Sequence, residues 1–108
     1  MKISVSDILH SQNAVFHDDG LSVFSEVKSA LEKGDTDIEV SFEHIKVCTT
    51  QFLNACFGKL LLAFGEETVK KTIHPVLYNS VNSFSDKYAL VWENFQEKNK
   101  SFIEEAYA

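Results

Sequence analysis

In the run Thr-Asp-Ile-Glu-Val-Ser-Phe, residues 36–42, polar and apolar side chains alternate strictly from Asp37 onward. Ile38, Val40 and Phe42 fall on one side of an extended chain, and the polar residues between them fall on the other. This pattern is typical of a strand with one buried face. The segments before and after it carry the 3.6-residue apolar period of amphipathic helices. The alternation therefore restricts the chain to a sheet with helices packed against it.

The helical segment before this strand covers residues 21–35, whose apolar side chains share one face at 100° per residue. Asp18 or Asp19 is the expected N-cap of this helix, because Asp is a favoured capping residue. Gly34 is well placed to end it.

The helical segment after the strand covers residues 48–65 and is the most apolar part of the chain. Gly65 is its expected end, and Asn54, Gly58 and Leu62 lie behind its apolar stripe. A glycine inside a helix costs about 1 kcal/mol relative to alanine. Gly58 therefore indicates that another backbone packs closely against this helix, and a glycine that is merely tolerated at this position is the alternative.

Two further strands and a last helix complete the order. Ile3 and Val5 alternate with polar residues and predict a short first strand or edge strand. Another strand is expected around residues 72–78, where Pro75 restricts it to an edge or breaks it. From about Ser80 the chain is helical, with a large aromatic stripe that is more typical of a core than of a ligand box. The stripe consists of Phe84, Tyr88, Val91, Trp92 and Phe95.

The order strand, helix, strand, helix, strand, helix predicts one α/β domain over residues 1–108. We expect a mixed or parallel sheet of about three to four strands with helices packed on it, and a long C-terminal helix. This helix is longer than such a domain needs, so the tail at about 97–108 is expected to break, to project or to pack on another molecule. Phe102, Ile103 and Tyr107 are the candidate contact of a homodimer, and folding back on the domain is the alternative.

Charge and cysteine content restrict the function. The formal net charge is −6, and all ten cationic side chains are lysines. Without arginine or a lysine cluster, the sequence argues against nucleic acid and anionic membranes as partners. No signal-peptide pattern opens the chain, and the longest uncharged run, residues 47–58, is too short to cross a bilayer. Cys48 and Cys56 are interpreted as reduced thiols, which is typical of a cytoplasmic protein.

Catalytic and metal-binding patterns are weak. His17 beside Asp18 and Asp19 is the only local group of histidine and carboxylates, whereas a metal needs three or four convergent ligands. His44 and Cys48 are the one conceivable nucleophile pair, without an orienting third group. We therefore expect no enzyme activity, no metal and no cofactor.

The run IEVSFEHIKVCTTQFLNACFGKL resembles the STAS-like domains of unknown function, relatives of the bacterial anti-sigma-factor antagonists. The family pattern has a strand ending in Phe, a short turn, a doublet of small hydroxyl residues, Phe, and a helix containing FGKL. The similarity extends outward and covers most of the chain up to about Phe95. The matching residues are Phe42, Ile45, Thr49, Thr50, Phe52 and Phe57-Gly58-Lys59-Leu60.

This resemblance implies a STAS-type fold and a regulatory binding module. In the antagonists, a Ser or Thr at the start of this helix is phosphorylated by a kinase of the GHKL ATPase type, and phosphorylation controls partner choice. The hydroxyl pair corresponds to Thr49 and Thr50, with Thr50 closer to the modified position. Cys48 stands where the antagonists usually have Asp, and Gln51 stands where they usually have Gly.

Two interpretations of the threonines remain open at this point. They cap the helix, as Ser and Thr often do, or they form a switch, since the start of a helix stabilises a phosphate. In the switch interpretation the surface that a GHKL-type ATPase or another regulator reads includes Gln51, Asn54 and Gly58. The alternatives are a structural or homo-oligomerising domain and, last, a small hydrolase or ligand-binding protein.

Overall fold

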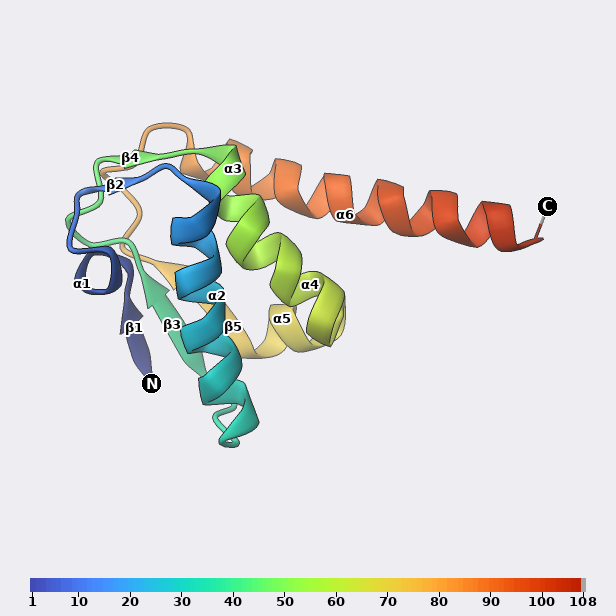
Figure 1. Cartoon of the computed structure of the whole chain (residues 1–108), viewed down its shortest axis with the longest axis horizontal. Coiled ribbons are helices and arrows are strands. Elements are labelled where there is room, and N and C mark those ends of the chain that lie inside the picture. Colours follow the sequence, from blue (N-terminus) through green and yellow to red (C-terminus); the bar gives the residue numbers. More distant parts are fainter. Residues whose placement is uncertain (108) are drawn as a thin grey trace.

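The computed structural model describes the backbone of residues 1–107 and the side chains of residues 1–97. It confirms the predicted α/β fold with a small sheet, packed helices and a long C-terminal helix (Figure 1). In chain order the elements are β1 (Lys2–Ser4), α1 (Val5–Leu9), β2 (Asn13–Ala14), α2 (His17–Glu32), β3 (Ile38–Ser41), β4 (Val47–Cys48), α3 (Thr50–Leu53), the π-helical η1 (Asn54–Gly58), α4 (Lys59–Phe64), α5 (Glu66–Thr72), β5 (Ile73–Val76) and α6 (Phe84–Tyr107).

The main sheet has three strands in the order β1–β3–β5, and β2 pairs with β4 as a separate short pair. All of these pairings are parallel, which selects the parallel sheet from the two predicted types. Val40 in the central strand lies opposite Ile3 on one side and Pro75 on the other. Pro75 is therefore in an edge strand, as its missing N–H group predicts.

The core forms where the sheet meets the helices. Ile38, Val40 and Phe42 are fully buried and Glu39 is exposed, as the alternation predicts. Ser41 was predicted on the open face but is also fully buried, so the end of the strand is covered on both faces. The ring of Phe42 lies at the centre of an aromatic cluster, with its centroid 4.8 Å from that of Phe84 and 6.4 Å from that of Phe52. The stripe of α6 packs onto this cluster, which confirms its assignment to the core in the described residues. Phe84 and Val91 are buried, and Tyr88, Trp92 and Phe95 are partly buried.

Helix α6 starts later than predicted. It begins at Phe84 rather than near Ser80, because the preceding residues form a turn in which Ser83 has a φ of +58°. The Ser80 hydroxyl donates to the carbonyl of Ile45 at 3.0 Å and so belongs to this turn. The first turns of α6 pack on the rest of the molecule, and its later turns extend away from it (Figure 1). Among the described residues, no helix is both long enough and apolar enough to cross a membrane.

The proposed contact residues of the tail, Phe102, Ile103 and Tyr107, lie outside the residues whose side chains the structure describes. The backbone helix α6 includes their positions. Their role in an oligomer stays a prediction.

The first strand is shorter than predicted. The alternation extends to Val5, but β1 ends at Ser4 and Val5 opens the short helix α1. The Ser4 side chain caps this helix by accepting from the Asp7 N–H group at 3.3 Å. The following loop contains the strand β2, which was not predicted because two residues are too few to show an alternation.

Helix α2 begins earlier than predicted. It starts at His17 after Phe16, so Asp18 and Asp19 lie in its first turn and neither is the N-cap. Acidic residues still stabilise that position through the helix dipole. Gly34 follows the end of the helix as predicted, with a φ of +96° and its N–H group donating to the Leu31 carbonyl at 3.0 Å.

The close backbone contact predicted at Gly58 occurs instead at Gly20. A Cβ atom on Gly58 would have its nearest neighbour, Asn54 Oδ1, at 3.8 Å, which is ordinary contact. A Cβ atom on Gly20 would lie 2.4 Å from the Phe52 carbonyl oxygen and 2.6 Å from Ala55 Cβ. Gly20 therefore allows α2 to pack directly against the continuous helix formed by α3, η1 and α4, and the two run side by side in Figure 1.

Candidate functional site

The first threonine of the pair caps the helix that runs from Thr50 to Phe64. Thr49 is extended, with φ −98° and ψ 158°, and its Oγ1 atom accepts from the Phe52 N–H group at 3.1 Å. The same hydroxyl donates to the Val15 carbonyl oxygen at 2.6 Å. One side chain thus satisfies a free donor of the helix start and ties that start to the segment before α2.

The second threonine is differently placed. Thr50 is the first residue of α3 and is half-buried, and its hydroxyl forms no hydrogen bond with any described residue. Gln51, beside it, is exposed. The structure therefore separates the roles of the two hydroxyls, because only that of Thr50 can be modified without breaking the cap.

A lysine from another element supplies positive charge at this helix start. Lys87 is in the first turn of α6, and its ammonium group donates to the Cys48 carbonyl oxygen at 2.8 Å. It therefore adds a positive charge to the positive end of the helix dipole. No local pattern indicated Lys87, because its place depends on how α6 docks.

The two thiols next to this region are buried and protonated. Burial raises the pKa of Cys48 to about 12, although the nearby Lys87 ammonium lowers it in part. Burial also raises the pKa of Cys56. His44 is exposed, and its Nε2 atom lies 3.7 Å from a carboxylate oxygen of Glu43. Because a thiolate is the nucleophilic form, Cys48 and His44 do not form an activated pair.

No three side chains of His, Cys, Asp or Glu converge within the described part of the chain in a way that could hold a metal ion. His17 contacts only Asp18 of the predicted group, with 3.8 Å between Nδ1 and the carboxylate oxygen. Both side chains are exposed at the start of α2.

The outer face of the Thr50–Phe64 helix lies open to solvent. Gln51, Asn54 and Leu62 are exposed along it, and Gly58 lies between them. This face is the floor of a groove of about 500 Å³ between the start of α2 and the middle of α6. The groove is lined by His17, Asn54, Ala55, Gly58, Lys59, Leu62, Val91, Asn94 and Phe95.

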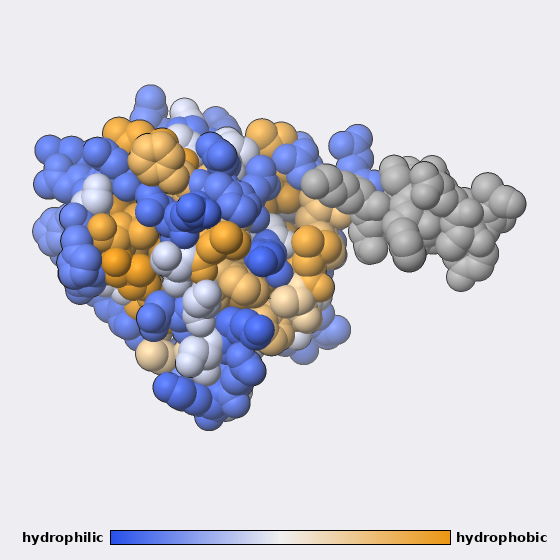
Figure 2. All heavy atoms as spheres, in the orientation of Figure 1, coloured by the Kyte–Doolittle hydropathy of each residue, from blue (hydrophilic) through white to orange (hydrophobic). Residues whose placement is uncertain are grey.

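Two of the predicted partner-surface residues, Asn54 and Gly58, thus line one groove, and Gln51 lies one turn before it on the exposed face. Leu62 lies four residues after Gly58 on the same side of the helix, where the sequence predicted it, behind the apolar stripe. The walls were not predicted, because they come from α2 and α6 and no local pattern indicates which residues these helices present there. Figure 2 shows hydrophobic atoms over α4 and near the point where α6 leaves the body.

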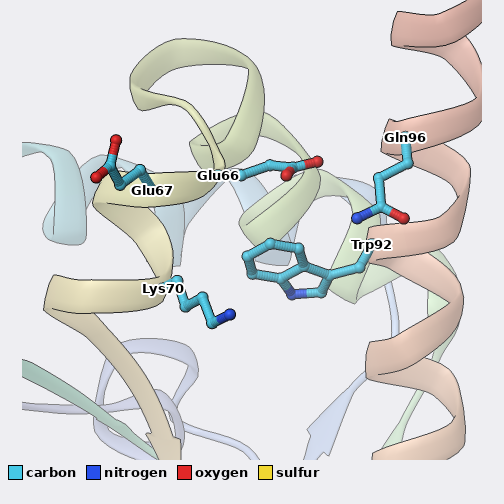
Figure 3. A pocket seen from close by; sticks show the side chains of 5 residues that line it. All are labelled: Glu66, Glu67, Lys70, Trp92 and Gln96. Carbon is cyan, nitrogen blue, oxygen red and sulfur yellow. The ribbon is translucent and has the colours of Figure 1, made fainter.

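A second hollow of about 540 Å³ lies between α5 and α6 (Figure 3). Glu66, Glu67 and Lys70 of α5 and Trp92 and Gln96 of α6 line it. Figure 3 shows Glu66 and Lys70 on opposite sides of the indole ring of Trp92. Carboxylates and an ammonium group thus lie beside the same ring, and their charges offset one another. Because this hollow offers a ligand no net charge of one sign, it is a weaker candidate for a binding site than the groove.

The cap makes a direct prediction about stability. Replacing Thr49 by Val keeps the shape of the side chain but removes its hydroxyl, so we expect the free energy of unfolding to fall by about 1–2 kcal/mol. Thr49→Ser keeps the hydroxyl and should recover most of this loss. Thr50→Val removes an unbonded hydroxyl and should change stability by less than about 0.5 kcal/mol. Urea denaturation of the three variants checks this, and equal losses for Thr49→Val and Thr50→Val would contradict the assignment.

These features define a small α/β domain that presents one open helix, capped at Thr49, beside a projecting C-terminal helix. The chain belongs to the family of STAS-like domains of unknown function, whose family model matches residues 19–81. The match runs from the first turn of α2 to the turn before α6, so it contains both threonines and the floor of the groove. No curated protein and no solved structure matched the chain.

Proposed function

We propose that this chain is a regulatory protein–protein interaction module, without enzymatic activity, that acts in the bacterial cytoplasm. Its recognition surface is the start and the outer face of the helix from Thr50 to Phe64. Phosphorylation of Thr50 switches the choice of partner, and the partner is a GHKL-type ATPase or another regulatory protein, as the resemblance to the antagonists implies.

The observation that carries this proposal is the different bonding of the two threonine hydroxyls. Thr49 Oγ1 is engaged by Phe52 and Val15, whereas the Thr50 hydroxyl is free of such bonds in the described structure. A phosphate on Thr50 would bring a charge of about −1.5 to −2 to the positive end of the helix dipole. The Lys87 ammonium, bonded to the Cys48 carbonyl, supports negative charge at the same end.

The exposed face supports the choice of partner surface. Gln51 and Asn54 continue from Thr50 along the solvent side of the helix, so a group added to Thr50 would change the edge of that surface. Hydroxyl modification next to an exposed helix face alters binding without requiring the fold to change.

The test is affinity capture from native lysate with the tagged wild-type chain and the variants Thr50→Glu and Thr50→Val. We expect phosphate on Thr50 and none on Thr49. The amount of partner protein that Thr50→Glu captures should differ from that of the wild type by about fivefold or more. Thr36→Glu is the matched control, because Thr36 is an exposed threonine in the turn between α2 and β3. It should leave capture unchanged, and circular dichroism should show that all variants are folded.

The opposite result would identify a different role. If both threonines stay unmodified across growth conditions and Thr50→Glu captures the same proteins as the wild type, the switch is wrong. Capture of only further copies of this chain would then favour the homo-oligomerising scaffold, with Phe102, Ile103 and Tyr107 as the first residues to replace.

A further inference from the structure

The groove beside the Thr50–Phe64 helix has the chemistry of a docking site. We propose that it binds an amphipathic helix of the partner protein, one that carries carboxylates beside its apolar face. The inference rests on the proposed function and deepens it, because it names the chemistry by which the partner is recognised.

The surroundings of the groove favour a helix as the bound element. Its floor and both walls are helical, from η1 and α4, the start of α2 and the middle of α6. Within the described residues no strand contributes to its lining, so the groove offers no backbone ladder to an extended peptide. The floor from Asn54 to Leu62 covers roughly 12 Å at 1.5 Å per residue, which matches about two turns of a docked helix.

The apolar part of the groove supplies the contact area. Leu62 is 73% exposed, the largest exposed fraction among the large hydrophobic residues described. Partly buried Phe95 lines the groove beside it, and the almost fully buried Ala55 and Val91 form its bottom, so most of the apolar contact area comes from Leu62. Gly58 has no side chain, and a Cβ placed there would have no described neighbour closer than 3.8 Å, so the middle of the floor stays low. A helix with apolar residues at spacings of three and four would insert its side chains here.

The charge of the groove differs from that of the whole chain. The chain has 16 acidic residues and a net charge of −6, yet none of the described carboxylates lines the groove. Its polar groups are the side chains of Lys59, His17, Asn54 and Asn94, all of which can donate hydrogen bonds.

Lys59 is the one full positive charge among the described residues that line the groove. The exposed Asp18 carboxylate lies 3.8 Å from His17, so we count His17 only as a donor. The Lys59 ammonium lies 5.3 Å from the centroid of the Phe24 ring, a cation–π contact that holds the lysine close to α2, which forms one wall of the groove. Charge complementarity therefore favours an acidic partner helix.

The experiment uses the full chain and two stapled helical peptides of about 18 residues, roughly 27 Å long. Both have the same leucine and alanine face. One carries Glu on the flanks of that face, and the other carries Lys at the same positions. The net charge of −6 would draw a basic peptide to this chain non-specifically. We expect the reverse order, with the Glu peptide binding at least about tenfold more tightly by fluorescence anisotropy.

Surface variants test whether binding occurs in the groove. Leu62→Asp and Lys59→Glu alter exposed side chains, so both should fold, and each should weaken the Glu peptide at least about tenfold. Leu77→Asp is the matched control: Leu77 is 50% exposed and lies in the turn after β5, outside the groove. It should leave binding within about twofold, and NMR shifts should map to the groove residues.

Three binding results would each overturn the docking site, and a sedimentation result would be a fourth. The binding results are a Lys peptide that binds as well as or better than the Glu peptide, no binding of either peptide, and equal binding by the Leu62→Asp variant. If sedimentation shows that a second copy covers the groove, and that Leu62→Asp dissociates it, the proposal is also wrong. None of these results tests the proposed phosphorylation of Thr50. A failed groove combined with Thr50-dependent capture would leave the proposed function in place with another contact surface.

Discussion

Replacing Gly20 by alanine is expected to lower the free energy of unfolding by about 3 kcal/mol, at the upper end of the usual cost of overpacking. The added Cβ atom would lie 2.4 Å from the Phe52 carbonyl oxygen, a backbone atom that cannot rotate away. It would also lie 2.6 Å from Ala55 Cβ. Helix α2 would have to move away from the Thr50–Phe64 helix, and the contacts between the two would loosen. Urea denaturation with an unchanged m-value measures the loss.

Gly58→Ala is the control, because Gly58 is in the same helix pair but has space for a methyl group. Alanine is favoured over glycine inside a helix by about 1 kcal/mol, so this variant should be neutral or somewhat more stable. If Gly20→Ala and Gly58→Ala lower the free energy of unfolding by the same amount, the close approach of α2 does not explain the glycine at position 20.

Replacing Phe42 by alanine is expected to lower the free energy of unfolding by about 3–5 kcal/mol, the usual cost of deleting a buried aromatic ring. Phe42 is fully buried where the end of β3 meets the helices. Its ring centroid is 4.8 Å from that of Phe84 and 6.5 Å from that of Phe57. The deletion would leave a cavity shared by β3, η1 and α6, which cannot collapse without moving all three. Urea denaturation again measures the loss.

Two further variants keep this prediction measurable. Phe42→Leu fills most of the cavity and should lose roughly half as much, which provides a value even if Phe42→Ala does not fold. Phe16→Ala removes a ring that is 68% exposed and should change stability by less than about 0.5 kcal/mol. A loss below about 1 kcal/mol for Phe42→Ala would show that the aromatic cluster does not hold the helices to the sheet.

The sequence predicted those parts of the fold that depend on local periodicity. The alternation of Ile38, Val40 and Phe42 and the helical stripes identified the central strand and the main helices. Pro75 identified an edge strand because it cannot donate a hydrogen bond there. The two-residue strand β2 was missed because it is too short to show a period.

Features that depend on docking were not predictable in the same way. A glycine at a close contact and a glycine tolerated in a helix look alike in sequence, so the pattern indicates Gly58 where the contact is at Gly20. Likewise, the sequence identified Thr49 and Thr50 together but not their difference. That difference comes from the Val15 carbonyl, 34 residues away from Thr49 along the chain, and from Lys87 on a later helix.

The two edges of the main sheet have a consequence for solubility. β1 is only three residues long, and β5 contains Pro75, which has no N–H group to donate to a further strand. Short or proline-bearing edges resist pairing with exposed strands of other chains, which is the first step of many aggregates. At high concentration, copies of this chain are therefore protected from pairing through the edges of their sheets. The exposed helical surface can face solvent without the sheet acting as a template for fibrils.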